Sequence, residues 1–503
     1  MDHFHTVKNM PQTAFFIAIY FDKALAAPSG NCTYKFMQDC NDLVQKQFKI
    51  GIDHEISIYI VYMDGLVNTE MLQESVIRPL LQDSFPQERI AISQYVIESA
   101  DWKWIDTMED AMTAVLSGNT ILFLGGEARA ILFSSKLFPT RGVQNADQEV
   151  AIVGPKDSFT ESLRMNTALI RRRIRDTRLK VIQKQIGTRS KTDYALMYIE
   201  DLVQKDILNK IQKQMDKICV DGIFDNGMLQ QYLEKDSKTP FPLYQLTQRP
   251  DKVASSIMEG RIAVVLDNSP MVLLLPVTFN VFFQASDDYY NRWEITTFVR
   301  ILRYVAAIIS IGLPGFYVAI AGFHPEVLPT PFLLALISAR EGVPFPVIVE
   351  VLLMELSFEL LREAGIRLPG QLGGTMGGQA AVDAHLVSTI VVIVVALTAI
   401  ATFSIPNELF TSAFRLMKFF LIILCAFWGL YGFFLGFLAI FIHLFYLENY
   451  GIPYAHPMVE ERGRLSTAFQ DFMVRYPLKW MKYRPEFTKE GARVRQKEDE
   501  DEK

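Results

Sequence analysis

The sequence has few of the residues from which metal sites and disulfide frameworks are built. Its 503 residues include four cysteines and seven histidines. Cys32 and Cys40 belong to no CxxC pair and have no neighbouring histidine set, so the spacing of a zinc site is missing. Cys425 lies in an apolar run. We therefore expect four free thiols and no metal or other cofactor, and nothing in the cysteine content indicates an oxidising compartment.

Catalytic motifs and long basic tracts are also missing. No GxGxxG follows a strand-like run, and the Walker A, HExxH and GxSxG motifs are absent. The formal net charge is −6, and no long run of lysine and arginine offers a surface to nucleic acid. We therefore expect a protein that is not an enzyme, has no catalytic residue and has no nucleic-acid partner.

What the chain does have is a change of character near residue 296. The sequence before this point is mixed and charged, whereas long apolar runs follow it. This pattern is typical of a soluble region followed by a membrane region. The expected fold class is an α+β membrane protein, in which two duplicated cytosolic α/β subdomains precede an all-α transmembrane domain.

The sequence of the soluble half contains two related copies of one pattern. Residues 62-YMDGLVNTEMLQ-73 match 198-YIEDLVQKDILN-209, and each stretch continues an apolar run of strand length. Each copy therefore predicts a strand, an acidic turn and a helix. The expected strands are 57–63 and 194–199, and the expected helices are 69–81 and 205–219.

The second part of each copy also recurs. Residues 108–133 align with 250–275 without a gap, and Gly118 matches Gly260. In both, a short helix runs into the glycine, and two apolar strands joined by a turn follow, which is typical of a hairpin. The sequence therefore predicts an N-terminal extension at 1–33 and two related subdomains at 34–140 and 180–290.

A basic segment at 141–179 connects the two subdomains. Ser158 and Glu161 have the spacing of a capping box, which predicts the start of a helix. One face of this helix is apolar, with Phe159, Leu163, Ile170 and Ile174. The rest is strongly basic, with Arg164, Arg171, Arg172, Arg173 and Arg175. Two interpretations stay open. The arginines form a docking surface for acidic partners, neighbouring subunits or membrane lipid, or a solvated face paired locally with Glu161 and Asp176.

The second half of the chain predicts four membrane spans. Each is near the roughly 20 residues that a helix needs to cross a bilayer, and the last is longer. The expected spans are 298–323, 345–361, 386–405 and 416–447, within a transmembrane domain at 291–450. Pro314 and Gly315 should kink the first span. Residues 329–338 are apolar but too short to cross, which indicates a re-entrant or interfacial piece.

Basic residues indicate how the spans are oriented. Three arginines lie at the start of the first span: Arg292 precedes it, and Arg300 and Arg303 lie in its first turns. Many lysines and arginines also lie in the tail at 451–503. By the positive-inside rule, both the N-terminal half and the tail are cytosolic, which requires an even number of spans. Arg415 and Lys418, at the start of the last span, disagree with this assignment.

Three glutamates interrupt the second expected span. At about 100° per residue, Glu355 and Glu359 share one face of the helix, and Glu350 lies roughly 140° from Glu355. A charge at the centre of a bilayer costs about 2.5 kcal/mol or more, so these side chains should face water, another helix or another copy. Glutamates arranged around a symmetric pore favour cations. Alternatively, they lie among headgroups or pair with Arg340 or Arg362.

Several longer motifs resemble one known family. They are 164-RMNTALIRRRIRD-176, 249-RPDKVA-254, 284-QASDDYY-290, 340-REGVPFP-346, 358-FELLREAGIRLP-369, 378-GQAAV-382 and 393-IVVALTAIA-401. Together they are similar to the A subunits of bacterial spore germinant receptors, and the similarity covers about residues 55–457.

The resemblance implies a receptor in the spore inner membrane, with a two-part cytosolic α/β domain and a helical membrane domain. It implies two partners, a transporter-like B subunit that senses the nutrient and a lipoprotein C subunit. It also implies a homo-oligomeric ring, a pentamer, that acts as a nutrient-gated channel for monovalent cations. We expect Glu350, Glu355 and Glu359 to line its ion pathway.

One segment departs from the family pattern. Residues 370-GQLGGTMG-377 stand where the family has a longer apolar stretch, and a deficit of about seven residues is about two helical turns. This leaves open whether the gate of this copy is altered. Two other functions also stay open: a non-conducting signalling scaffold of the germination complex, and a stage V sporulation paralogue that amplifies ion release.

Overall fold

The computed structural model divides the chain into two compact units. It describes residues 39–50, 56–81, 102–124, 129–137, 153–234, 239–367, 387–458, 471–485 and 487–495. The first unit, here called the sheet unit, comprises residues 1–233, 246–275 and 484–494. The second, the helical unit, comprises 234–245, 276–483 and 495–503. The predicted tail is thus divided between the two units, and the predicted extension at 1–33 lies outside the described residues.

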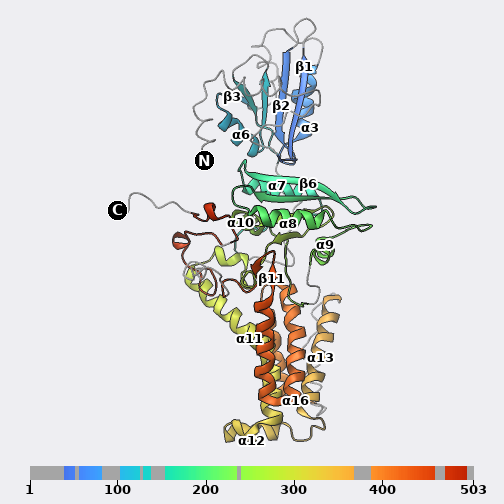
Figure 1. The fold of residues 1–503 in the computed structure, drawn as a ribbon, viewed down its shortest axis with the longest axis vertical. Helices are drawn as coiled ribbons and strands as arrows, with labels where there is room; N and C mark the ends of the chain where they lie inside the picture. The colour runs from blue at the N-terminus through green and yellow to red at the C-terminus, as the bar shows by residue number, and fades with distance from the viewer. Residues whose placement is uncertain are drawn as a thin grey trace, which may run out of the picture. The chain divides into compact units, whose positions relative to one another are not determined.

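Each half of the sheet unit holds a β-sheet (Figure 1), and the two sheets each have five strands in the same order. The orders are β1-β2-β4-β5-β3 and β6-β7-β9-β10-β8. The first sheet consists of β1 (Leu43–Ile50), β2 (Ile56–Met63), β4 (Thr120–Leu124), β5 (Ala130–Phe133) and β3 (Trp102–Ile105). The second consists of β6 (Leu179–Ile186), β7 (Thr192–Ile199), β9 (Ile262–Leu266), β10 (Val272–Leu275) and β8 (Gln245–Thr247).

The duplication expected from the sequence extends to the register of the two sheets. Ile58 pairs with Leu124 in the first sheet, and Tyr194 pairs with Leu266 in the second. These pairs occupy the same positions of the two sequence repeats. Because a shift of one residue would turn every side chain to the opposite face, equal registers mean that both copies bury the same repeat positions.

The helices of the sheet unit are also matched. Helix α6 (Met108–Leu116) and helix α10 (Pro250–Met258) both end beside a glycine in the left-handed region, Gly118 with φ 86° and Gly260 with φ 91°. That conformation favours glycine and ends a helix. The other helical elements are α3 (Thr69–Leu72), the π-turn η1 (Gln73–Ile77), α4 (Arg78–Leu81), α7 (Leu163–Arg173), α8 (Lys205–Met215), α9 (Asn226–Leu233) and the 3-10 turn η7 (Glu490–Ala492).

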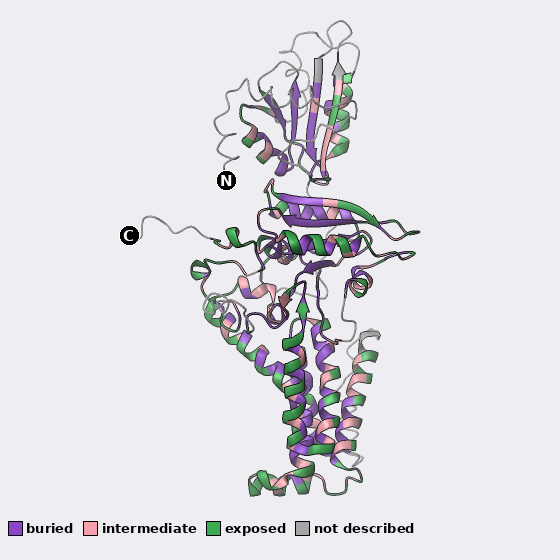
Figure 2. Ribbon diagram, in the orientation of Figure 1, coloured by how far each residue is buried: buried purple, intermediate pink, exposed green. Residues whose placement is uncertain are grey.

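The central strands of the first sheet are buried on both faces (Figure 2). In β2, Val61 and Met63 belong to a core cluster with α6, whereas Ile58 and Ile60 belong to a second cluster with α3 and α4. A strand covered on both faces has no need of alternating polar residues, so β2 reads as a nearly continuous apolar run. Each such side chain contributes about 1.5–3 kcal/mol to folding.

The predicted capping box does not start the connecting helix. α7 begins at Leu163 with Ser162 as N-cap, later than Ser158. The N–H of Leu163 donates to Asp267 Oδ1 at 2.9 Å, and Asp267 lies in the turn between β9 and β10. This acceptor is 104 positions away in sequence, so local spacing could not reveal it. The predicted apolar face is confirmed, because its four residues lie in one core cluster.

The helical unit is built from five helices and short connecting turns within its described residues. The helices are α11 (Trp293–Phe323), α12 (Thr330–Ala339), α13 (Val347–Arg367), α15 (Thr389–Phe403) and α16 (Glu408–Tyr446). The short elements are the 3-10 turns η3 (Phe279–Phe283), η4 (Ser286–Tyr289), η5 (Pro325–Val327) and η6 (Leu478–Trp480), and the strands β11 (Glu448–Asn449) and β12 (Ile452–Pro453). α11 continues unbroken through Pro314.

Helix α16 is a hairpin of two helical arms. Gly429 has φ 54° and ψ −136°, which is not a helical conformation. A side chain at Gly432 would overlap the carbonyl oxygen of Leu424, and one at Gly436 would meet the side chain of Leu421. In a straight helix, residues eight positions apart are about 12 Å apart along the axis. The chain therefore folds back at Gly429, and the predicted fourth span, 416–447, is not one straight helix.

Small residues let α11 approach both arms. A Cβ built on Gly315 lies 3.2 Å from Cys425 Sγ, and one on Gly312 lies 2.9 Å from the ring of Phe437. Small residues at helix contacts are typical of membrane bundles. By length and composition, α11 and α16 are the described helices that could cross a membrane, while α12 and α15 are shorter apolar helices. α13 carries too many charged residues to pass the same test.

We predict that Gly429→Ala destabilises the helical unit. A side chain there would take a backbone conformation that costs about 1–3 kcal/mol, and its Cβ would lie 3.0 Å from Phe323. Thermal unfolding of the full-length protein in detergent measures the effect. Gly322→Ala is the matched control, because a Cβ at Gly322 meets nothing within 4 Å. Equal melting temperatures for the two variants would contradict the hairpin.

Candidate functional site

The glutamates of α13 face cationic residues of α16. Lys418 Nζ lies 2.5 Å from Glu355 Oε2 and 3.5 Å from Glu359 Oε1. Arg415 Nη1 donates to Glu359 Oε2 at 3.2 Å. We call these four residues the ion-pair ladder. The side chains of Glu355 and Lys418 are 1% and 4% exposed, so their pair is inside the protein.

The ladder follows from helical spacing on two antiparallel helices. Glu355 and Glu359 are one turn apart on α13, and Arg415 and Lys418 are three residues apart on the first arm of α16, so each set occupies one face. Two negative and two positive charges cancel. Neutralisation inside the bundle removes much of the penalty for placing carboxylates among apolar helices. The two basic residues that disagreed with the predicted orientation therefore have a different role, as partners of the glutamates.

Glu350 has separate partners. Its side chain is fully buried, and it accepts a hydrogen bond from the backbone N–H of Ser388, at the start of α15. Arg340 Nε lies 3.5 Å from Glu350 Oε2, which is the pairing with Arg340 that the sequence left open as the alternative to an ion pathway. Arg362 instead lies 3.6 Å from Glu408. The three glutamates thus form two separate sites on α13, as their angular separation predicted.

The basic helix α7 directs its central arginine inward. Arg171 donates to Asp42 through Nε at 2.6 Å and Nη2 at 3.0 Å, and their side chains are 1% and 4% exposed. Burial lowers the pKa of Arg171, but the adjacent Asp42 carboxylate outweighs burial and holds the pKa above the ordinary arginine value. Burial also raises the pKa of the neighbouring Cys40 thiol. Arg171 therefore joins α7 to the first repeat and is not offered to a partner.

The other arginines of the predicted docking surface differ in exposure. Arg173 pairs with Asp157 at 2.6 Å, and Arg164 pairs with Asp64. Arg172 and Arg175 are exposed. Arg164, Arg171 and Arg173 thus pair with Asp64, Asp42 and Asp157 and not with Glu161 or Asp176, the partners expected from local spacing. Asp176 pairs with Arg178 instead. The docking hypothesis stays a prediction, and its exposed residues are Arg164, Arg172 and Arg175.

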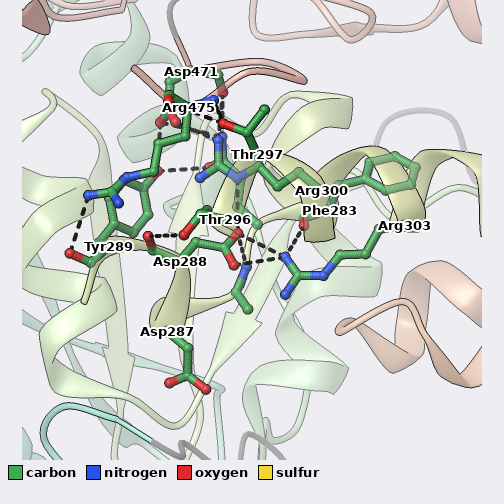
Figure 3. Close-up of polar contacts among 12 residues, drawn as sticks. Phe283, Asp287, Asp288, Tyr289, Thr296, Thr297, Arg300, Arg303, Asp471 and Arg475 are labelled. Atoms are coloured by element: carbon green, nitrogen blue, oxygen red, sulfur yellow. Dashed lines mark hydrogen bonds and ion pairs between the residues drawn. The ribbon is translucent and has the colours of Figure 1, made fainter. Parts of the chain in front are cut away.

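A third charged cluster surrounds the first turns of α11 (Figure 3). Arg300 is fully buried and bridges two acids, with Nε 3.0 Å from Asp288 Oδ2 and Nη1 2.6 Å from Asp471 Oδ1. Arg303 also contacts Asp288, at 2.8 Å. Burial and the nearby Arg300 lower the pKa of Arg475, which donates to backbone carbonyls. The cluster holds residues 471–475 against α11.

Sequence reasoning missed the acids and bases that complete these clusters. Asp42 and Asp471 are distant in sequence from the arginines they bind, and nothing local marks them. Asp288 lies only 12 positions before Arg300, within the motif 284-QASDDYY-290, so its pairing had a local signal. Lys418 could have been found, because a lysine within an apolar run needs a buried acid and α13 offers three. Cys40, Cys219 and Cys425 are free, as expected. Among the described residues, no group of histidine, cysteine and acidic side chains could hold a metal.

We predict that Arg171→Ala strongly destabilises the sheet unit. Removing one partner of a buried pair leaves the Asp42 charge uncompensated, which costs about 3–5 kcal/mol. Chemical denaturation of the full-length protein, followed by tryptophan fluorescence, measures the loss. Arg175→Ala, an exposed position just beyond the same helix, should change stability by less than about 0.5 kcal/mol. A small effect at Arg171 would show that the pair does not join α7 to the first repeat.

The sequence of the chain is similar to those of known spore germination proteins. Residues 32–487 match the family model described as Bacillus/Clostridium GerA spore germination protein. The chain is similar to spore germination protein KA of Bacillus subtilis, with 37% identity over 93% of this chain and 87% of the relative. It is also similar to spore germination protein A1 of Bacillus subtilis, with 34% identity over 93% of this chain and 96% of the relative.

A third relative is spore germination protein GerQA of Bacillus cereus, 33% identical over 95% of this chain and 97% of the relative. Among solved structures, the chain is similar to the N-terminal domain of the A subunit of the Bacillus megaterium spore germinant receptor GerK3. The identity is 29%, the match covers 49% of this chain and 92% of that chain, and the TM-score is 0.39.

Proposed function

The chain belongs to the Bacillus/Clostridium GerA family of spore germination proteins, and from this premise we propose that it is the A subunit of a nutrient germinant receptor. Its helical unit spans the spore inner membrane, and copies of the chain assemble into a ring that conducts monovalent cations when the receptor detects a nutrient. The partners are a transporter-like B subunit, which senses the nutrient, and a lipoprotein C subunit.

The surface of the helical unit supports a membrane location. Large apolar side chains on α16 are strongly exposed: Phe427 and Tyr431 are each 72% exposed, and Phe434 is 68% exposed. Figure 2 shows this exposure along its helices. A soluble protein rarely leaves so many large apolar side chains in water. Lipid or other copies of the chain would cover these residues, with the sheet unit and the tail in the cytosol.

The ion-pair ladder is the observation that carries the conducting role. Carboxylates at Glu355 and Glu359 can stabilise a passing cation. In this structure Lys418 and Arg415 neutralise them, so we assign the structure to the closed state. Glu350 lies apart from the ladder and is the third proposed pathway residue. In the assembled ring, the exposed Arg172 and Arg175 are the residues that we propose to contact neighbouring subunits or the headgroups of acidic lipids.

The same ladder also favours a second function. Its two negative and two positive charges cancel, as expected for ion pairs that only hold α13 against α16. In that case the receptor subunit is a non-conducting scaffold, and the membrane helices only anchor it. The two functions differ in whether a neutral ladder still supports ion release.

We predict that Glu355→Gln combined with Lys418→Gln slows potassium release during germination by about tenfold or more, the effect of losing about 1.4 kcal/mol of cation stabilisation. Both charges are removed together, because removing only one would leave the other buried and without a partner. Potassium release is measured on spores in which this receptor is the sole one, after addition of mixed amino acids, sugars and nucleosides.

The control is Glu326→Gln combined with Glu341→Gln, which neutralises two exposed carboxylates between α11 and α13. The control should release potassium at the wild-type rate. Receptor levels are matched by immunoblotting. Unchanged release from the neutral-ladder spores would support the scaffold and exclude Glu355 from the conduction path.

A further inference from the structure

The ladder has the composition of a cation site filled by a lysine. The ammonium of Lys418 lies between two carboxylates, at 2.5 Å from Glu355 and 3.5 Å from Glu359. We propose that Glu355 and Glu359 form a binding site for one free monovalent cation, and that the tethered ammonium of Lys418 occupies this site in the present structure. An ammonium group and a potassium ion are similar in size and carry the same charge.

The net charge of Glu355, Glu359 and Arg415 favours a monovalent over a divalent cation. Arg415 contacts Glu359 independently of Lys418, at 3.2 Å. If the ammonium leaves, one negative charge therefore stays uncompensated in a buried position, which is strongly unfavourable. One monovalent cation restores neutrality, whereas a divalent cation leaves an excess positive charge. The site should therefore take potassium, rubidium or ammonium in preference to magnesium or calcium.

A carboxylate oxygen without a hydrogen-bond partner is the second observation that points to an ion. Glu355 Oε1 is buried and has no hydrogen-bond partner among the described residues. The ammonium is held by its side-chain stem close to one oxygen of Glu355, and its contact with Glu359 is longer. A free ion has no stem, so it can approach both oxygens of Glu355 and the near oxygen of Glu359 together.

Lys418 then controls whether the cation site is open to a free ion. Resting on the proposed function, we assign departure of the Lys418 ammonium as the step that opens the site to potassium. The ammonium then competes with the conducted ion, because both require the same carboxylates. Withdrawal of Lys418 by movement of α16 relative to α13 exposes the site, and its return closes it.

The test uses Lys418→Ala in the full-length protein purified in detergent. Thermal unfolding is followed in N-methylglucamine chloride, potassium chloride and magnesium chloride at equal ionic strength. Potassium should raise the melting temperature of the variant by about 3 °C or more over N-methylglucamine, through binding to the folded state. Magnesium should not reproduce the shift. Wild type and Lys479→Ala, which loses an exposed lysine on η6, should show no potassium-specific shift.

The decisive control adds Glu355→Gln to Lys418→Ala, which removes the uncompensated charge and should abolish the potassium response. A response that persists in this double variant, or its absence in Lys418→Ala, overturns the proposal. If Lys418→Ala does not fold in any salt, Lys418→Gln takes its place, because its amide can still contact Glu355. No potassium-specific stabilisation of Lys418→Gln would then be the contrary result.

Potassium leakage from spores distinguishes a failure of the cation site from a failure of the proposed conducting role. Spores that carry Lys418→Ala should lose potassium without any nutrient, whereas those with Lys479→Ala should retain it. Ion binding by the purified variant without leakage from spores supports the site but removes its conducting role. Leakage without ion binding overturns the site and leaves the conducting role intact.

Discussion

The ion pair between Glu355 and Lys418 is the contact that allows α13 to lie in an apolar bundle. A charge in such surroundings must be neutralised or removed, and here each helix supplies the partner that the other needs. The pair joins positions 63 apart in sequence. In the sheet unit, Arg171 and Asp42 form a comparable buried ion pair between positions 129 residues apart. Buried ion pairs thus fix the packing of distant segments in both units.

These pairs specify position more than they add stability. Replacing a whole buried pair with apolar residues is often neutral, while removing one partner is costly. The ladder therefore sets the register of α13 against the first arm of α16, because sliding by one turn would place Lys418 opposite Glu359 and leave Glu355 unpaired. The Arg300 cluster fixes the start of α11 in the same way, since Asp288 and Asp471 must both reach one guanidinium.

Local patterns in the sequence were sufficient for much of this fold. The repeats, the strands around Gly118 and Gly260 and the apolar face of α7 all depend on residues within a few positions of each other. Asp42, which binds Arg171, Asp471, which binds Arg300, and Asp267, which caps α7, all come from more than 100 positions away. No spacing rule reports them. The hairpin of α16 had a signal, because its apolar run exceeds one span and Gly429 interrupts it, but a single long span fits the same composition.

The ladder changes what the glutamates can do. A ring of unpaired carboxylates attracts cations at all times, whereas carboxylates already bound to lysine and arginine attract them only after the cationic groups move away. Charge attraction and closure then reside in the same residues. If the chain conducts cations as we propose, its conducting state must separate Lys418 from Glu355. The energy for that separation then has to come from a change in the packing of α13 against α16 or from the arriving cation. In the conducting function that we propose, the buried pair both holds α13 against α16 in the closed state and is the contact whose loss opens the pathway.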